Sequence, residues 1–233
     1  MTSPSSRRAL AALLLSSGLA LAACSGSSGS DAAAASSSGS MSDSMSGHDH
    51  ASQAPAEVEG GKQGPYAGIN LTTPYVKPEF TLTDSTGASY DFGARTGTNP
   101  TLLFFGYTNC PDVCPTTMAD VSIALRKVDK AVAARTNVVF VTTDPTRDTP
   151  QALGTWLGRF DGDLPTKYVG LTGNQQQVDQ AQLAAGVPLA EDMGQTHSAM
   201  LLLYGADGKA HVAFNAAETP ADIAHDLALV AQG

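Results

Sequence analysis

Two kinds of hydrophobic pattern organise the middle of the chain. Residues 102–105 form an uninterrupted apolar run that ends at Gly106, and residues 138–142 form a second run rich in β-branched side chains. Continuous runs of this length predict buried strands of the kind found in parallel sheets. Between them, apolar residues recur at helical spacing from Met118 to Val128. The pattern therefore predicts a strand, a loop, a helix and a second strand in that order.

Shorter segments predict the remaining strands. Phe80 and Leu82 alternate with threonines, and a turn at residues 84–87 leads into residues 89–92, which predicts a hairpin. Residues 168–171 predict a short strand. A late hairpin is predicted where residues 199–204 continue through an Asp-Gly turn into residues 211–214.

Helix starts are marked by capping residues. Thr149 and Thr219 are each followed by a proline, which is favoured at the first helical position. Asn174 has Gln177 three residues on, as in a capping box. These signals predict one helix from Pro150 to about Phe160, one after Asn174, and a last one from Pro220 to Val230.

The order of these elements defines the fold class. A hairpin is followed by alternating strands and helices, then by a second hairpin and a terminal helix. Alternating units with antiparallel additions predict an α/β fold in which a central mixed β-sheet is flanked by helices on both faces. This layout is thioredoxin-like.

Composition narrows the function classes. The chain has 233 residues, with 13 basic residues against 22 acidic ones and a formal net charge of −9. This balance argues against nucleic-acid binding, because such proteins carry basic surfaces. The length fits one domain plus appendages.

The N-terminus resembles a bacterial lipoprotein signal. Arg7 and Arg8 precede an apolar stretch of residues 9–23, which is short for a membrane-spanning helix and typical of a signal peptide. It ends in Leu-Ala-Ala-Cys, which resembles a lipobox in which Cys24 is lipidated and becomes the new N-terminus. Removal of residues 1–23 leaves 11 basic and 22 acidic residues. The alternative is an ordinary cleaved signal with an incidental cysteine.

A low-complexity segment follows this signal. Residues 24–68 are rich in serine, glycine and alanine, and they predict a disordered tether ahead of a folded domain at residues 69–233. Residues 41–50 contain two methionines and two histidines. Thioether and imidazole groups bind copper, so this segment is either a weak metal-collecting patch or a plain solvated linker.

Two of the three cysteines carry the candidate chemistry. Cys110 and Cys114 lie between the first buried strand and the helix after it, with Pro115 suited to the first helical turn. The positive end of the helix dipole favours thiolates there, so we expect both cysteines to have lowered pKa values. Such a pair can form a reversible disulfide or bind a soft metal ion. A purely structural disulfide is the third alternative, although so short a loop gains little from cross-linking.

Three motifs together resemble the Sco/SenC family of thioredoxin-like, membrane-tethered copper proteins, which help to assemble the copper centre of cytochrome c oxidase. The motifs are FGYTNCPDVCP from Phe105, DPTRDTP from Asp144, and a histidine before a late strand. The resemblance implies that Cys110, Cys114 and His197 bind copper as Cu(I) or Cu(II). Family members commonly carry aspartate before that histidine, whereas this chain has Thr196. A hydroxyl orients an imidazole less strongly than a carboxylate does.

The resemblance leaves two functions open. One is a copper metallochaperone, lipid-anchored on the extracytoplasmic face of the cell membrane, whose partner is the copper-binding subunit of the oxidase. The other is a thiol–disulfide oxidoreductase that uses Cys110 and Cys114 as a redox-active pair to reduce such a subunit or other exported proteins. The added imidazole favours the chaperone, because disulfide exchange does not need it. We expect His211 and His225 to be surface or packing residues, and Arg147 and Asp148 to brace the loop.

Overall fold

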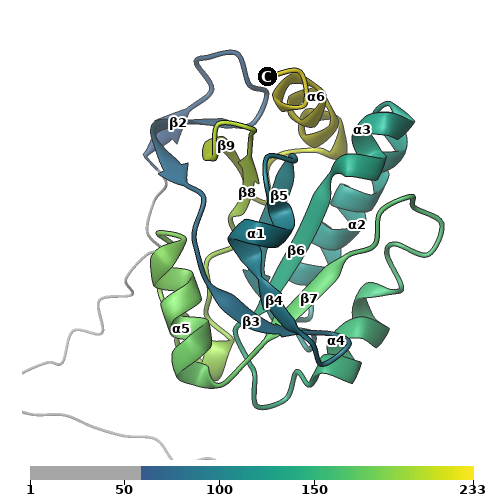
Figure 1. The fold of residues 1–233 in the computed structure, drawn as a ribbon. Coiled ribbons are helices and arrows are strands. Elements are labelled where there is room, and N and C mark those ends of the chain that lie inside the picture. The colour runs from purple at the N-terminus through teal and green to yellow at the C-terminus, as the bar shows by residue number, and fades with distance from the viewer. Residues whose placement is uncertain (1–58) are drawn as a thin grey trace, which may run out of the picture. The chain divides into compact units, whose positions relative to one another are not determined.

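The computed structural model describes residues 59–233, which form one nine-stranded mixed sheet covered by helices (Figure 1). The order of strands across the sheet is β1-β2-β9-β8-β5-β6-β7-β3-β4. Their bounds are β1 Gly60–Gly61, β2 Ile69–Val76, β3 Thr81–Asp84, β4 Ser89–Asp91, β5 Thr101–Gly106, β6 Asn137–Thr142, β7 Val169–Thr172, β8 Leu201–Tyr204 and β9 Lys209–Phe214.

Six α-helices and one short 3₁₀ turn are present in this part of the chain. Their bounds are α1 Phe92–Thr96, α2 Val113–Lys127, α3 Lys130–Arg135, α4 Pro150–Leu157, α5 Gln175–Ala184, η1 Asp192–Gly194 and α6 Pro220–Val230.

Strand β5 is the centre of the sheet, and all six of its residues are buried. It pairs in parallel with β6 from Thr101↔Asn137 to Gly106↔Thr142, and in antiparallel with β8 on its other side. Since β6 also pairs in parallel with β7, the carboxyl ends of three strands meet at one edge of the sheet. The loop that carries Cys110 starts at this edge.

Apolar side chains pack on both faces of the sheet. One face carries α2, α3, α4 and α6, and its core includes Phe104, Met118, Phe140 and Leu227. The other face carries α1 and α5, and its core includes Phe92 and Phe105. Figure 1 shows α5 on the opposite side of the sheet from α2. The alternation of Phe104 and Phe105 between the two cores follows from the two-residue period of a strand.

Most of the predicted elements are confirmed. The parallel strands, both hairpins and the thioredoxin-like layout are present. Thr149 caps α4 through the backbone N–H of Ala152, and Asn174 and Gln177 form the predicted capping box. Helix α4 ends at Leu157, three residues earlier than expected. No sequence pattern predicted β2, α1 or α3.

The folded part starts earlier than the expected boundary at Ile69. Residues 59–68 belong to the domain, since Gly60 and Gly61 pair with β2. The buried carboxylate of Asp226 accepts hydrogen bonds from the backbone N–H groups of Ala67 and Gly68, each at 2.8 Å. These donors satisfy a carboxylate that is fully shielded from solvent, so the segment is part of the packing and not of a tether.

The other N-terminal predictions lie outside the described residues. They are the signal peptide at residues 1–23, the lipidated Cys24, the tether up to residue 58 and the methionine- and histidine-containing patch at residues 41–50. Among residues 59–233, no helix is both long and apolar enough to span a bilayer.

Candidate metal centre

Three segments that are distant in sequence bring Cys110, Cys114 and His197 together. Cys110 lies in the loop after β5, Cys114 is the second residue of α2, and His197 lies in the loop before β8. One ligand atom from each residue can be chosen so that all three lie within 4.8 Å of one another. Among residues 59–233, these three side chains form the group whose ligand atoms lie close enough together to hold a metal ion. The structure therefore assembles the three residues that the sequence singled out.

A glycine at the end of β5 makes room for the buried sulfur. A Cβ atom on Gly106 would lie 2.7 Å from Cys114 Sγ and 2.8 Å from the ring of Phe104. Such distances are far inside van der Waals contact, so a larger residue would displace the sulfur or the ring. Gly106 thus sets how closely α2 approaches the sheet at the candidate centre.

Asp148 ties the cysteine loop to the end of β6. Its buried carboxylate accepts hydrogen bonds from Thr108 N at 2.9 Å, Thr108 Oγ1 at 2.5 Å and Thr142 Oγ1 at 2.7 Å. Arg147 forms an ion pair with Asp144 in the same turn. These contacts confirm the prediction that Arg147 and Asp148 brace the loop.

Hydrogen bonding sets the orientation of His197. Its Nδ1 lies 2.9 Å from the carbonyl oxygen of Ser198, which can only accept, so Nδ1 carries the proton. In the neutral ring, Nε2 is then unprotonated, and it lies 3.5 Å from Cys114 Sγ. A lone pair that faces the sulfurs is the arrangement required of a metal ligand.

Two aromatic rings hold the imidazole from its sides. The ring of His197 packs edge to face with Tyr107 at 5.6 Å and with Phe104 at 6.1 Å between centroids, at interplanar angles of 89°. Neither Tyr107 nor Phe104 was predicted from the sequence to belong to the site. The only feature of the sequence that could have indicated them is their proximity to Cys110.

The loop before His197 is fixed to the end of β6. Thr143 Oγ1 donates a hydrogen bond of 2.7 Å to the carbonyl oxygen of Gly194. Gly194 has a φ of +88°, and a Cβ there would lie 2.1 Å from Thr143 O, so only glycine fits. Thr196 bonds Asp192 at 3.0 Å and makes no hydrogen bond to the imidazole. The orientation of His197 thus comes from a backbone carbonyl and not from the residue before it.

The two cysteines differ in acidity, contrary to the expectation that both pKa values are lowered. Burial raises the pKa of Cys110, but hydrogen bonds from the backbone N–H groups of Cys114, Asp112 and Val113 outweigh it and leave the pKa lowered. Burial raises the pKa of the Cys114 thiol well above its usual value. Proximity to the helix N-terminus therefore favours a thiolate only at the more exposed sulfur.

Burial also acts on the histidine. It lowers the pKa of His197, and the hydrogen bond to Ser198 only partly offsets this effect. The imidazole is therefore neutral at pH 7 and available as a donor. Two soft sulfurs and one imidazole are a donor set suited to copper.

The other two described histidines lie outside this group. His211 Nε2 is 2.8 Å from Asp207, and His225 Nδ1 is 2.7 Å from Asp226, and both are partly exposed. They are surface residues with acidic partners, as expected.

The fold and the site together define a thioredoxin-like protein with a two-cysteine, one-histidine centre at the carboxyl edge of its parallel strands. The chain belongs to the SCO1/SenC family, whose model matches residues 70–232.

Similar proteins include an SCO2-like protein of Rickettsia conorii, which is 37% identical over 119 residues, 49% of this chain and 54% of the relative. The chain spans about half the length of the curated relatives that it matches. The structure of Bradyrhizobium japonicum ScoI with copper bound is 34% identical, with a TM-score of 0.56, covering 66% of this chain and 99% of that one.

BsSco shares the fold at 23% identity, with a TM-score of 0.53, over 68% of this chain and 95% of that one. It has a disulfide switch and is described as a member of the Sco family of cytochrome c oxidase assembly proteins.

Proposed function

We propose that this protein is a copper metallochaperone that binds the ion through Cys110, Cys114 and His197 and transfers it to a partner. The observation that carries this proposal is the convergence of two sulfurs and one oriented imidazole nitrogen within 4.8 Å. Copper is here the cargo, and the protein's part is to offer donors that accept the ion and release it again. The copper-bound ScoI structure supports copper as that ion.

The partner that we propose is the copper-binding subunit of cytochrome c oxidase. Membership of the SCO1/SenC family supports this choice, as does the description of BsSco as a member of the Sco family of cytochrome c oxidase assembly proteins. Lipidation at Cys24, after removal of residues 1–23, would hold the domain at the extracytoplasmic face of the cell membrane. A tether up to residue 58 would then give the domain reach toward its partner.

A second function, thiol–disulfide exchange, is favoured by a separate observation. Cys110 is partly exposed and has a lowered pKa, whereas Cys114 is buried and has a raised one. An accessible thiolate beside a protected thiol suits attack on a disulfide followed by resolution of the mixed disulfide. The two functions use the same sulfurs and differ in their need for His197.

The substitution His197→Ala separates the two functions. Two thiolates satisfy Cu(I), whereas Cu(II) prefers nitrogen or oxygen donors, so the variant should retain Cu(I) and bind Cu(II) much more weakly. It should still reduce a model disulfide. In a deletion strain, the chaperone function predicts that His197→Ala fails to restore oxidase activity, while the control His211→Ala restores it. Full activity with His197→Ala would instead favour the reductase.

A further inference from the structure

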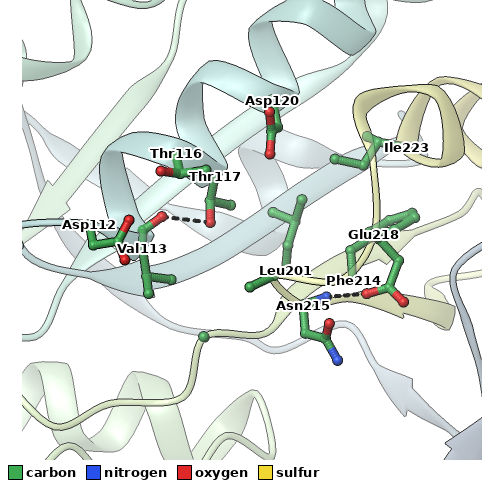
Figure 2. Close-up of a pocket in the computed structure, with 12 residues that line it drawn as sticks. Asp112, Val113, Thr116, Thr117, Asp120, Leu201, Phe214, Asn215, Glu218 and Ile223 are labelled. Carbon is green, nitrogen blue, oxygen red and sulfur yellow. Dashed lines mark hydrogen bonds between the residues drawn. The ribbon is translucent and has the colours of Figure 1, made fainter.

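A narrow groove opens beside the candidate metal centre, between the start of α2 and the strands β8 and β9 (Figure 2). One end is formed by Asp112 and Val113, which lie between Cys110 and Cys114 in the sequence, and by Ala199, two residues after His197. A protein that exchanges copper with this site must bring its own ligands to the same edge. The groove therefore lies where such a partner would make contact.

The floor and far wall of the groove are apolar. Leu201 and Phe214 from the sheet and Ile223 from α6 line it, and each is almost fully buried. The cavity volume is about 80 Å³. This is far below the several hundred Å³ typical of sites for small molecules, so the groove suits a single side chain.

The wall formed by α2 and its N-cap carries negative charge that no cation among residues 59–233 pairs with. Figure 2 shows Asp112 immediately before this helix and Asp120 on it, with Asp120 directed into the groove. Burial raises the pKa of Asp120, and within the described part of the chain no hydrogen bond or opposite charge offsets that burial. Glu218, on the opposite wall, is different: it pairs with Lys62 at 2.6 Å and accepts from Asn215 N at 2.7 Å. A partly desolvated carboxylate without a cation is complementary to an incoming positive charge.

We propose that this groove receives an arginine or lysine side chain of the protein with which the metal centre exchanges copper. The aliphatic stem of that side chain lies against Val113 and Ala199, above the apolar floor of the groove, and its charged end reaches Asp120 and Asp112. Long basic side chains bury their stems in this way while their charge stays at a polar rim. The inference rests on the proposed function, since it names how the copper partner is held beside the site.

The groove can be tested without the partner. The probe is the peptide acetyl-Ala-Arg-Ala-amide, titrated into the 15N-labelled protein, with the isosteric neutral citrulline peptide as its control. We expect saturable shifts of the backbone amides at residues 113–120 and 214–223 with the arginine peptide only. Asp120→Asn should weaken this binding by about fivefold or more, and Glu79→Gln, an exposed carboxylate against α1, should leave it unchanged. Equal shifts with citrulline, or equal affinity in Asp120→Asn, would overturn the proposal.

Other occupants give distinct outcomes. If the same amides shift when the protein alone is concentrated, the groove is a contact between two copies of this chain. If they shift with magnesium chloride alone, it is a cation site. Either result would overturn the proposal.

A second measurement uses the proposed partner. The probe is the soluble copper-binding domain of the oxidase subunit, and the readout is its affinity by calorimetry. Asp120→Lys should weaken association by about tenfold or more, Glu79→Lys should not, and both should keep the copper stoichiometry of the unaltered protein. If the two variants bind the oxidase domain with equal affinity, the proposed role of the groove is wrong, while the proposed chaperone function is unaffected. If the oxidase domain binds neither the unaltered protein nor its variants, the proposed client is wrong. The peptide titration then tests whether the groove binds a basic side chain.

Discussion

Cys110 and Cys114 are four residues apart and share one helix N-terminus, yet their surroundings differ. Backbone N–H groups of the first turn point at Cys110, whereas Cys114 lies against Gly106 with its side chain fully buried. Desolvation of a thiolate outweighs the helix dipole at the buried position. The sequence located both sulfurs, but it could not show which of them is accessible, because burial depends on how closely α2 packs on the sheet.

This difference predicts selective alkylation. In the reduced, metal-free protein at pH 7, iodoacetamide should modify Cys110 at least about tenfold faster than Cys114, because it is more exposed and has more thiolate. Peptide mass spectrometry after short exposure measures both sites. Addition of copper should protect both cysteines. Equal rates at the two sites would contradict the assignment of their environments.

The position of His197 was predicted from a motif, but its orientation was not. The sequence showed that Thr196 replaces the usual aspartate, a weaker partner for the imidazole; in the structure Thr196 bonds Asp192, and the carbonyl of Ser198 holds Nδ1. Backbone carbonyl directions and aromatic contacts such as Tyr107 arise from tertiary packing, so no local pattern reports them.

At the scale of elements, the site depends on the two loops that leave β5 and β6. Asp148 links these loops through three hydrogen bonds from Thr108 and Thr142. Asp148→Ala leaves these donors buried without an acceptor and should lower the free energy of unfolding by about 3 kcal/mol. Urea denaturation monitored by circular dichroism measures the loss.

The same substitution should weaken copper binding, because Thr108 is two residues from Cys110. Asp163→Ala is the matched control, since Asp163 pairs with Arg126 on the surface, and it should change neither stability nor copper binding. If Asp148→Ala is as stable as this control, the hydrogen bonds that Asp148 accepts do not stabilise the fold.

The elements that the sequence predicted are those with strong local signals. Strands β5 and β6 have long apolar runs, and α4, α5 and α6 start at threonine or asparagine caps. Helices α1 and α3 have five and six residues, too few to show helical periodicity. Strand β2 lies near the edge of the sheet and contains polar residues and a proline, so tertiary pairing with β9 and not its own pattern defines it.

At the scale of the molecule, the N-terminal boundary was set ten residues too late, because residues 59–68 have the composition of a tether. They are held by distant partners: Asp226 accepts from Ala67 and Gly68, and Lys62 pairs with Glu218. A protein that begins at residue 69 should therefore be less stable than one that begins at residue 59, by about 2 kcal/mol. Both proteins should carry the same Gly-Ser leader, and urea midpoints compare them. Identical midpoints would refute a structural role for residues 59–68.

Membrane attachment is tested by Cys24→Ser. Lipidation requires the thiol, so the variant should accumulate as an unprocessed precursor or leave the membrane fraction. Fractionation followed by immunoblotting distinguishes these outcomes from the mature, membrane-bound form. A variant that matures and sediments with membranes as before would contradict the lipoprotein interpretation.

The central claim is that Cys110, Cys114 and His197 form one copper site, and titration of the reduced protein with Cu(II) tests it most directly. We expect one tight equivalent with thiolate-to-copper absorption, which is lost in Cys114→Ser, strongly weakened in His197→Ala and unchanged in His211→Ala. Deletion of residues 41–50 should leave the binding of this one copper equivalent unchanged. The claim would be contradicted if Cys114→Ser kept the absorption, or if deletion of residues 41–50 abolished it.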